Sequence, residues 1–272
     1  MIKNKVYLSV GAQFKNEAHI LTEWLNHYIK QGVQHFILMN DNSTDGFIKN
    51  KYLQHLIKKR IVTLINLSKK NKGQIYNLQN ILIPYAQKCT KWLIVCDLDE
   101  FVYTPTHNFL GKALIKYERF DSIFIFWKIF LTSNNNSQPK SVINSNIMSI
   151  GYETDIFNNI SGISGGFGKS IYNLSRNIHN ITIHGREIKN KFLITNKNND
   201  FELNHYKYQS REFMIKIKGP RGGGVKKNKY KEITNLIIKN NKIPTDYLLL
   251  KFYYNGKKII KDNELKNLYS GQ

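Results

Sequence analysis

The sequence has few cysteines and no long apolar stretch. Cys89 and Cys96 are the only cysteines among 272 residues, so a disulfide framework is not expected and a reducing compartment is predicted. No run of about 18 apolar residues occurs, and the apolar part of segment 1–11 is too short for a signal peptide or a membrane span. We therefore expect a soluble, cytoplasmic protein.

Acidic residues are also scarce. The chain has 19 Asp and Glu against 41 Lys and Arg, which gives a net charge of +22. From His205 to the end there are 16 basic and 5 acidic residues. This end is expected to meet an anionic partner such as nucleic acid, acidic lipid head groups or a phosphorylated small molecule. Simple solvation of the lysines is the alternative, and charge alone does not choose among these.

Apolar runs alternate with helix-length segments over the first hundred residues. Strands are predicted over 6–10, 33–39, 61–67 and 92–98. Between them, apolar residues at steps of three and four predict a helix over 17–31, a second ends near Lys58, and a third covers 75–87, where Pro84 would kink or end it. This alternation predicts an α/β fold with a mostly parallel central sheet flanked by helices.

Polar clusters follow three of the predicted strands. They are "KNE" at 15–17, "NDNSTD" at 40–45 and "DLDE" at 97–100. Sheets of this kind bind ligands at the carboxyl ends of their strands, where such clusters meet. Adjacent carboxylates repel one another unless a cation joins them, and oxygen ligands suit Mn²⁺ or Mg²⁺. The sequence therefore predicts a metal site that holds a diphosphate.

Two other enzyme classes also use an Asp-x-Asp motif or paired carboxylates. Haloacid-dehalogenase-type phosphatases end the first strand of their core with Asp-x-Asp, usually with Thr or Val at the fifth position. Here the motif ends the fourth strand and Phe101 stands at that position, so a metal–nucleotide site is preferred. A nucleotidyltransferase remains an alternative, because paired carboxylates and a metal also hold nucleotide phosphates there. A basic nucleic-acid-binding module is the non-enzyme alternative.

Three stretches of sequence together resemble a known family. They are "FKNEAHILTEWLNHYIKQGVQHFILMNDNSTDG", "KWLIVCDLDEF" and "NHYKYQSREFMIKIKGPRGG", in this order along the chain. The set resembles glycosyltransferases of the GT-A fold, and is most similar to glycosyltransferase family 92. The resemblance implies a GT-A-like (Rossmann-like) fold in a single domain over 1–272. Residues 1–101 would bind the nucleotide sugar, 102–230 would hold the acceptor and the chemistry, and 231–272 would be a basic C-terminal extension.

The resemblance also implies roles for individual residues. Asp97 and Asp99 would hold the metal together with His205, and Asp97 would also approach the ribose. Asp45 is expected to brace its turn instead of binding the donor. The residues implied in nucleotide-sugar binding are Asn16, Glu17, Asp41, Asp97, Lys169, Lys218 and Arg221.

The middle of the chain gives weaker signals. A strand is predicted over 122–130, in which Trp127 either stacks on an acceptor sugar or packs in the core. Inversion at the anomeric carbon needs a carboxylate to accept the acceptor's proton, and Glu153 and Asp155 are the candidates for this base.

Taken together, these inferences predict an inverting, metal-dependent glycosyltransferase. The expected donor is a UDP-sugar with Mn²⁺ or Mg²⁺, and the expected acceptor is a glycan or glycoconjugate hydroxyl. No nucleic-acid partner is expected, and peripheral contact with an anionic membrane is allowed by the basic surface.

Overall fold

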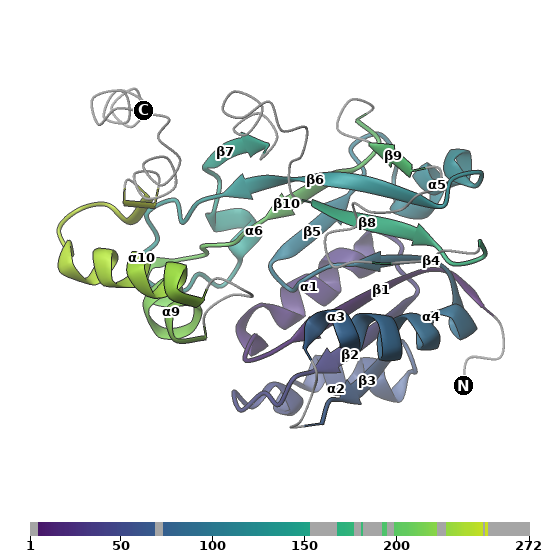
Figure 1. Cartoon of the computed structure of the whole chain (residues 1–272), viewed down its shortest axis with the longest axis horizontal. Coiled ribbons are helices and arrows are strands. Elements are labelled where there is room, and N and C mark those ends of the chain that lie inside the picture. Colours follow the sequence, from purple (N-terminus) through teal and green to yellow (C-terminus); the bar gives the residue numbers. More distant parts are fainter. Residues whose placement is uncertain are drawn as a thin grey trace. The chain divides into compact units, whose positions relative to one another are not determined.

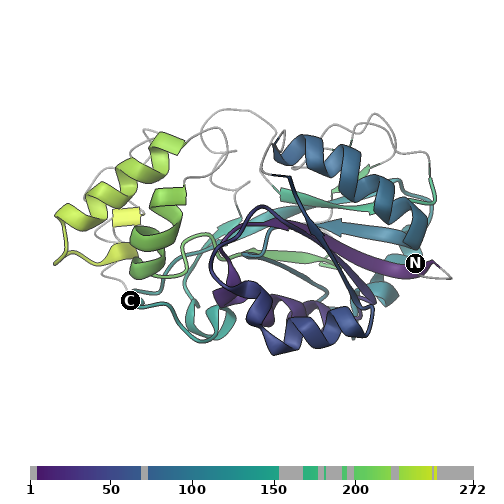
Figure 2. The same ribbon diagram turned by 90° about the horizontal axis from the view of Figure 1, so that it is seen from below.

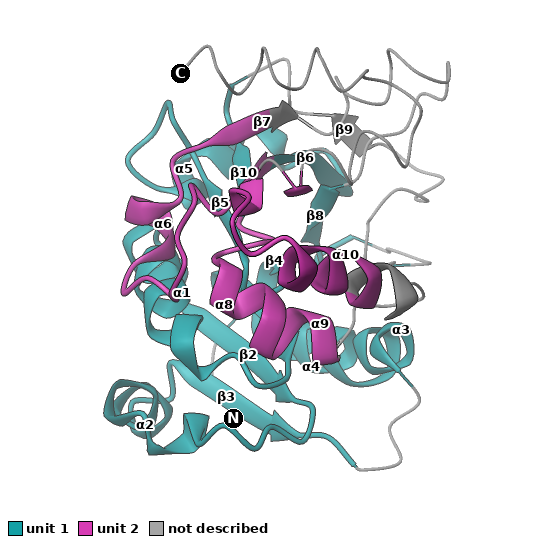
Figure 3. Ribbon diagram, turned by 90° about the vertical axis from the view of Figure 1, so that its left-hand side faces the viewer, with its two compact units in different colours: residues 1–128, 152–154, 164–205 teal, residues 129–151, 155–163, 206–272 magenta. Residues whose placement is uncertain are grey.

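A computed structural model describes most of the chain (Figure 1). The described residues are 5–68, 73–152, 168–176, 181, 192–194, 199–221, 227–246, 248 and 249. They form two compact units (Figure 3): unit 1 comprises residues 1–128, 152–154 and 164–205, and unit 2 comprises residues 129–151, 155–163 and 206–272. The predicted single domain, divided near residues 101 and 230, stays a prediction.

Unit 1 begins with four parallel strands. They are β1 (Val6–Phe14), β2 (His35–Asn40), β3 (Val62–Asn66) and β4 (Thr90–Val95), in the spatial order β3-β2-β1-β4. The helices between them are α1 (Ala18–Lys30), the short η1 (Phe47–Lys49) and α2 (Lys51–Lys58). The predicted α/β fold is confirmed in this half, because apolar strands separated by helical crossovers pair in parallel.

The crossover between β3 and β4 is one continuous helical segment. It comprises α3 (Gln74–Asn77), a π-helical turn (Leu78–Leu82) and α4 (Ile83–Cys89). Pro84 lies at the start of α4 and does not end the helix, since the π turn directly before it changes the hydrogen-bond pattern. At Gly11 of β1 a Cβ would lie 2.7 Å from Cδ1 of Leu82, so glycine allows this close packing of helix on strand.

The second half of the sheet in unit 1 is mostly antiparallel. Its strands are β5 (Glu100–Tyr103), β6 (Ser122–Phe130), β8 (Gly168–Asn173), β9 (Phe192–Ile194) and β10 (Glu202–His205). Strand β8 lies antiparallel between β4 and β6, β10 pairs antiparallel with β5, and β9 runs parallel to β6. Helix α5 (Leu110–Leu114) and η3 (Ile115–Tyr117) follow β5. The sheet is therefore mixed, and largely parallel on the side of β1.

Helices cover both faces of the parallel strands (Figure 2). Helices α1 and α2 lie on one face, where Asn50 at the start of α2 donates to the Thr22 hydroxyl of α1 over 2.7 Å. Helices α3 and α4 lie on the other face. There Leu78, Leu82 and Ala86 pack against Leu93 of β4 in a buried cluster. Burial on both faces explains why the strands are apolar throughout.

Asp200 ties the segment before β10 to helix η3. Its carboxylate accepts hydrogen bonds from the hydroxyls of Tyr117 and Thr106, and it forms an ion pair with Lys116 at 2.6 Å. Burial alone raises the pKa of Asp200, but the hydrogen bonds from Lys116 and Tyr117 outweigh it and lower the pKa below its ordinary value. The ionised carboxylate therefore stabilises the fold.

Replacing Asp200 with Asn should lower the free energy of unfolding by about 1–3 kcal/mol at pH 7. Because the folded pKa lies below the unfolded one, this stabilisation is complete above the ordinary pKa of about 4 and is lost as the pH falls through the folded value. Urea unfolding at pH 7 and pH 3 should show a deficit that shrinks in acid. Tyr117→Phe, which keeps the ion pair, should retain the pH dependence; a pH-independent deficit in Asp200→Asn would contradict this reading.

Unit 2 consists of short elements and one longer helix. They are α6 (Val142–Ser145), β7 (Ser149–Tyr152), α8 (Arg211–Phe213), a π-helical segment η4 (Met214–Lys218), α9 (Gly219–Arg221) and α10 (Lys227–Lys239). In α10, Ile233 and Ile237 are buried, and the Thr234 hydroxyl donates to the Met214 carbonyl of η4 over 3.2 Å. This part of the predicted C-terminal extension packs into the unit.

Asp246 fixes the residues after α10 in unit 2. Its fully buried carboxylate accepts from the backbone N–H groups of Thr132 at 2.8 Å and Asn134 at 3.1 Å.

Along the described parts of the chain, no helix combines the length and the apolar character that crossing a membrane requires.

Candidate functional site

The acidic segment "DLDE" forms a closed turn between β4 and β5. Beyond β4, the backbone N–H of Cys96 donates to the carbonyl of Gly11, so this residue still lies beside β1. Within the turn, the N–H of Glu100 donates to the carbonyl of Asp97 at 3.1 Å, and the N–H of Asp97 donates to Oε2 of Glu100 at 2.9 Å. The Glu100 side chain therefore closes the turn that carries it.

Two buried aromatic residues of helix α1 fix this turn through hydrogen bonds to its backbone. The Trp24 indole N–H lies 3.1 Å from the carbonyl oxygens of both Asp97 and Glu100. The Tyr28 hydroxyl donates to the carbonyl of Glu100 at 3.1 Å and accepts from the N–H of Val102 at 3.0 Å. The helical period predicted that Trp24 and Tyr28 are buried. It did not predict that the indole N–H and the phenol hydroxyl bind the backbone of the acidic turn.

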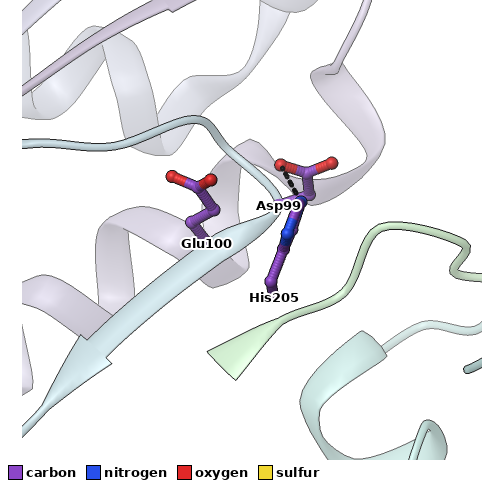
Figure 4. Close-up of side chains that lie close together, drawn as sticks. All are labelled: Asp99, Glu100 and His205. Carbon is purple, nitrogen blue, oxygen red and sulfur yellow. Dashed lines mark ion pairs between the residues drawn. The ribbon is translucent and has the colours of Figure 1, made fainter. Parts of the chain in front are cut away.

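Three buried side chains form a group that could hold a metal ion (Figure 4). Asp99 and Glu100 come from the turn, and His205 ends β10, where the β5–β10 register places it opposite Glu100. One ligand atom from each lies within 4.8 Å of the others, and Nε2 of His205 is 3.6 Å from Oδ1 of Asp99. Oε1 of Glu100 is buried, with no hydrogen-bond partner among the described residues.

The chemistry of this group fits a divalent cation. Two carboxylates and one imidazole suit Mn²⁺, which accepts both oxygen and nitrogen ligands. A buried carboxylate oxygen with no described hydrogen bond is costly unless a bound group satisfies it. The ring of Trp127, itself buried, lies 4.5 Å from the His205 ring between centroids and supports the imidazole. Glu100 was not among the predicted ligands, because the sequence does not show which way a strand's first residue points.

Asp97 lies in a different set of contacts. Its Oδ2 is 2.9 Å from Nζ of Lys169, and its Oδ1 accepts a hydrogen bond from the Gln74 amide at 3.1 Å. Lys169 reaches the turn because β8 runs antiparallel to β4 with Ile171 opposite Ile94, so that Lys169 extends past the end of β4. The structure brings together Asp99 and His205, two of the three predicted ligands, and places Asp97 beside Lys169.

Charge in the turn is unevenly compensated. Burial and the neighbouring Asp97 and Asp99 raise the pKa of Glu100 well above its ordinary value, against the opposing effect of Lys169. Burial also raises the pKa of Asp97, but the Lys169 ammonium outweighs it and the pKa falls below the ordinary value. Burial lowers the pKa of Lys169, yet Asp97 and Glu100 more than reverse this and raise it. The pair of Lys169 and Asp97 is therefore ionised.

The loops after β1 and β2 lie side by side at the same edge of the sheet. Asn16 accepts through its side chain from the N–H of Thr44 at 2.7 Å, and its own N–H donates to the Ser43 hydroxyl at 3.0 Å. Asp45 accepts from the N–H of Ala18 at 2.7 Å and from the N–H of Phe47 at 3.3 Å, so its carboxylate braces the turn and the loop beside it. These contacts give the two loops one fixed arrangement.

Asp41 joins this edge to the helix on the other face. The amide of Gln13 donates to Asp41 at 3.3 Å, and the Asn77 amide of α3 donates to Gln13 at 3.1 Å. Since β2, β1 and β4 are neighbours, the predicted donor residues Asn16, Glu17 and Asp41 belong to the edge that carries Asp97. Glu17 is buried.

The remaining predicted residues lie outside the described residues or in unit 2. Glu153 and Asp155, the candidate bases, lie outside the described residues. Lys218 is buried on η4 of unit 2, and its ammonium lies 6.0 Å from the centre of the Phe213 ring. Arg221 ends α9 in the same unit. Their roles stay predictions.

Two curated proteins with similar sequences are both described as glycosyltransferase family 92 proteins. A glycosyltransferase family 92 protein of Ricinus communis is 27% identical over 110 residues, which is 39% of this chain and 18% of that protein. One from Oryza sativa subsp. japonica is 26% identical over 110 residues, which is 40% of this chain and 18% of that protein. The matched segment thus spans about a fifth of the length of these curated relatives.

Several solved structures of glycosyltransferases are similar to this chain at low sequence identity. TarS 1–349 of S. aureus in complex with UDP-GlcNAc matches with a TM-score of 0.45 and 14% identity, over 86% of this chain and 72% of that one. GalNAc-T7 with UDP, GalNAc and Mn²⁺ matches with a TM-score of 0.46 and 12% identity, over 97% of this chain and 56% of that one. The mannosyltransferase PcManGT of Pyrobaculum calidifontis, in complex with GDP-Man and Mn²⁺, matches with a TM-score of 0.45 and 12% identity, over 99% of this chain and 80% of that one.

The family model extends over most of the chain. Residues 4–247 match the model described as glycosyltransferase family 92. This span contains all three motifs on which the sequence resemblance rests, including the acidic turn and the segment that begins at Asn204. The chain therefore belongs to glycosyltransferase family 92.

Proposed function

We propose that this protein is a metal-dependent glycosyltransferase that moves a sugar from a UDP-sugar to a hydroxyl of a glycan or glycoconjugate, with inversion. The observation that carries the proposal is the buried group of Asp99, Glu100 and His205 at the end of a parallel sheet, in a chain of family 92. Its position at the carboxyl ends of the strands is where such sheets bind nucleotides.

The residues of the turn would divide the work of binding the donor. Asp99, Glu100 and His205 would hold Mn²⁺ or Mg²⁺, which supplies positive charge against the charge that develops on the departing nucleoside diphosphate. Asp97 offers an ionised carboxylate with about a third of its side-chain surface exposed, as expected for a group that accepts hydrogen bonds from ribose hydroxyls. In the neighbouring loops, Asn16 and Asp41 would contact the nucleoside.

Two further roles follow from the sequence resemblance. Lys218 and Arg221 would contact the diphosphate, where cationic donors stabilise the transition state most. Glu153 or Asp155 would accept the proton of the attacking hydroxyl.

Contact of the basic surface with an anionic membrane would bring the enzyme to a membrane-bound glycoconjugate.

A thermal-shift panel of nucleotide sugars, with and without Mn²⁺, tests this proposal. A ligand that binds only the folded protein stabilises it by about 2.7 kcal/mol at a hundred times its Kd, which for a chain of this size raises the Tm by about 5 °C or more. We expect such a shift with UDP-sugars only when Mn²⁺ is present. Stabilisation by a nucleoside triphosphate with release of pyrophosphate, or tight and salt-sensitive binding of nucleic acid with no response to UDP-sugars, would contradict the proposal.

A further inference from the structure

Lys169 is buried at the acidic turn, with 1% of its surface exposed. Its ammonium lies 2.9 Å from Oδ2 of Asp97 and 3.4 Å from Oε2 of Glu100. Burial of a lysine ammonium is expensive unless an opposite charge stays in contact with it. This lysine is therefore committed to the carboxylates of the turn, and it offers little surface to a ligand from solution.

Both oxygens of Asp97 are held by other side chains. Lys169 of β8 binds Oδ2, and Gln74 at the start of α3 donates to Oδ1 over 3.1 Å. A carboxylate whose two oxygens are bound by side chains from two different elements keeps one orientation. Asp97 nevertheless retains about a third of its side-chain surface in contact with solvent, so it stays open to a ligand.

Glu100 separates the turn into two halves. Its Oε2 accepts from the N–H of Asp97 and lies 3.4 Å from the Lys169 ammonium, and its Oε1 has no hydrogen-bond partner among the described residues. The Glu100 carboxylate also belongs to the group with Asp99 and His205. One half is thus an ion pair that already balances its own charge. The other half is the group that Asp99 and His205 form with Glu100.

We infer that Lys169 and Gln74 are positioning residues that fix Asp97 as an acceptor for the donor nucleotide, and that the divalent cation is held by Asp99, Glu100 and His205 without Asp97. This inference rests on the proposed function for the identity of the donor. It changes the role implied by the sequence, in which Asp97 was a metal ligand and Lys169 contacted the nucleotide directly. A built-in ammonium at Asp97 keeps a second cation away from that carboxylate.

Mn²⁺ alone, added to the full chain, tests the division of the turn by thermal shift. Asp97→Asn should keep the Mn²⁺ response of the wild type, and Asp99→Asn should lose it. Loss of the Mn²⁺ response in Asp97→Asn would overturn the inference. This measurement needs no donor, so it tests the inference separately from the proposed function. A wild type that binds Mn²⁺ but no UDP-sugar would contradict the proposed function and not this division of the turn.

Donor affinity in the presence of Mn²⁺ tests the positioning roles. Lys169→Met should weaken binding of the UDP-sugar about tenfold or more, the size expected when a hydrogen bond to a charged group is lost, while the Mn²⁺ response is kept. Gln74→Leu should act in the same direction with a smaller effect, and it tests the same step if Lys169→Met does not fold. Lys116→Met, which removes the ammonium paired with Asp200 elsewhere in unit 1, is the matched control and should leave donor affinity unchanged.

A double-mutant cycle distinguishes positioning from general structural support. If Lys169 acts through Asp97, then Lys169→Met combined with Asp97→Asn should bind the donor no more weakly than Asp97→Asn alone. Additive losses, or a Lys169→Met variant that binds the donor like the wild type, would overturn the inference.

Discussion

Replacing Asp99 with asparagine is expected to lower kcat by a factor of about a hundred to a thousand, the range seen when one group that stabilises developing charge is removed. Asp99 is buried and contributes a carboxylate to the group with Glu100 and His205. Asparagine keeps the shape of the side chain but removes its charge. The cation site is therefore weakened where the leaving diphosphate needs it, whereas packing of the turn changes little.

The measurement is kcat and KM for transfer from a UDP-sugar at saturating Mn²⁺, together with the thermal shift given by Mn²⁺ alone. Asp121→Asn is the matched control, because Asp121 pairs with Arg176 away from the turn and should affect neither quantity strongly. Removing metal from the wild type with a chelator should reproduce the loss, and the same treatment should have little further effect on Asp99→Asn. An Asp99→Asn variant that keeps wild-type kcat and the full Mn²⁺ response would show that Asp99 does not hold the metal, and a wild type that keeps its kcat after chelation would contradict the metal-dependent mechanism.

The parallel half of the fold could be predicted because its signals are local. Helix α1 buries the residues that recur at three- and four-residue steps, such as Ile20, Trp24 and Tyr28, and each parallel strand is an apolar run. The neighbours β1, β2 and β3 follow from short crossovers, whereas the crossover from β3 passes β2 and β1 to place β4 beside β1. The polar clusters after β1, β2 and β4 therefore meet at one edge, as the sequence indicated.

The antiparallel half and its contacts to the turn depend on pairing between distant segments. Lys169 and Asp97 are 72 residues apart, and only the pairing of β8 with β4 brings them together. His205 was predicted as a ligand through its motif, whereas the grouping of Glu100 with it depends on a turn that the hydrogen bond from the N–H of Asp97 to Oε2 of Glu100 closes. No periodicity in the sequence reports such a bond. Gln74 was missed for the same reason, since its position in the chain indicated only the start of a helix.

Gly168→Ala is expected to lower the free energy of unfolding by about 3 kcal/mol or more, at the upper end of the cost of overpacking a core. Gly168 begins β8 and lies opposite Phe126 of β6. A Cβ there would be 2.0 Å from the carbonyl oxygen of Ile125 and 2.9 Å from its carbonyl carbon. Both atoms belong to the backbone of the neighbouring strand, so no side-chain rotation relieves the clash and the strands must separate.

The effect should reach the acidic turn, because Lys169 is the next residue along β8. A strand displaced from β6 at residue 168 shifts the ammonium relative to Asp97, so donor affinity should fall together with stability. Urea unfolding and donor titration measure the two effects. Gly111→Ala is the matched control: it lies in helix α5, the atoms nearest to its added Cβ are side-chain atoms at 3.6 Å, and alanine there should leave stability unchanged or raise it by up to about 1 kcal/mol. If Gly168→Ala unfolded at the same urea concentration as Gly111→Ala, the close approach of β8 to β6 would not be what holds Lys169 against the turn.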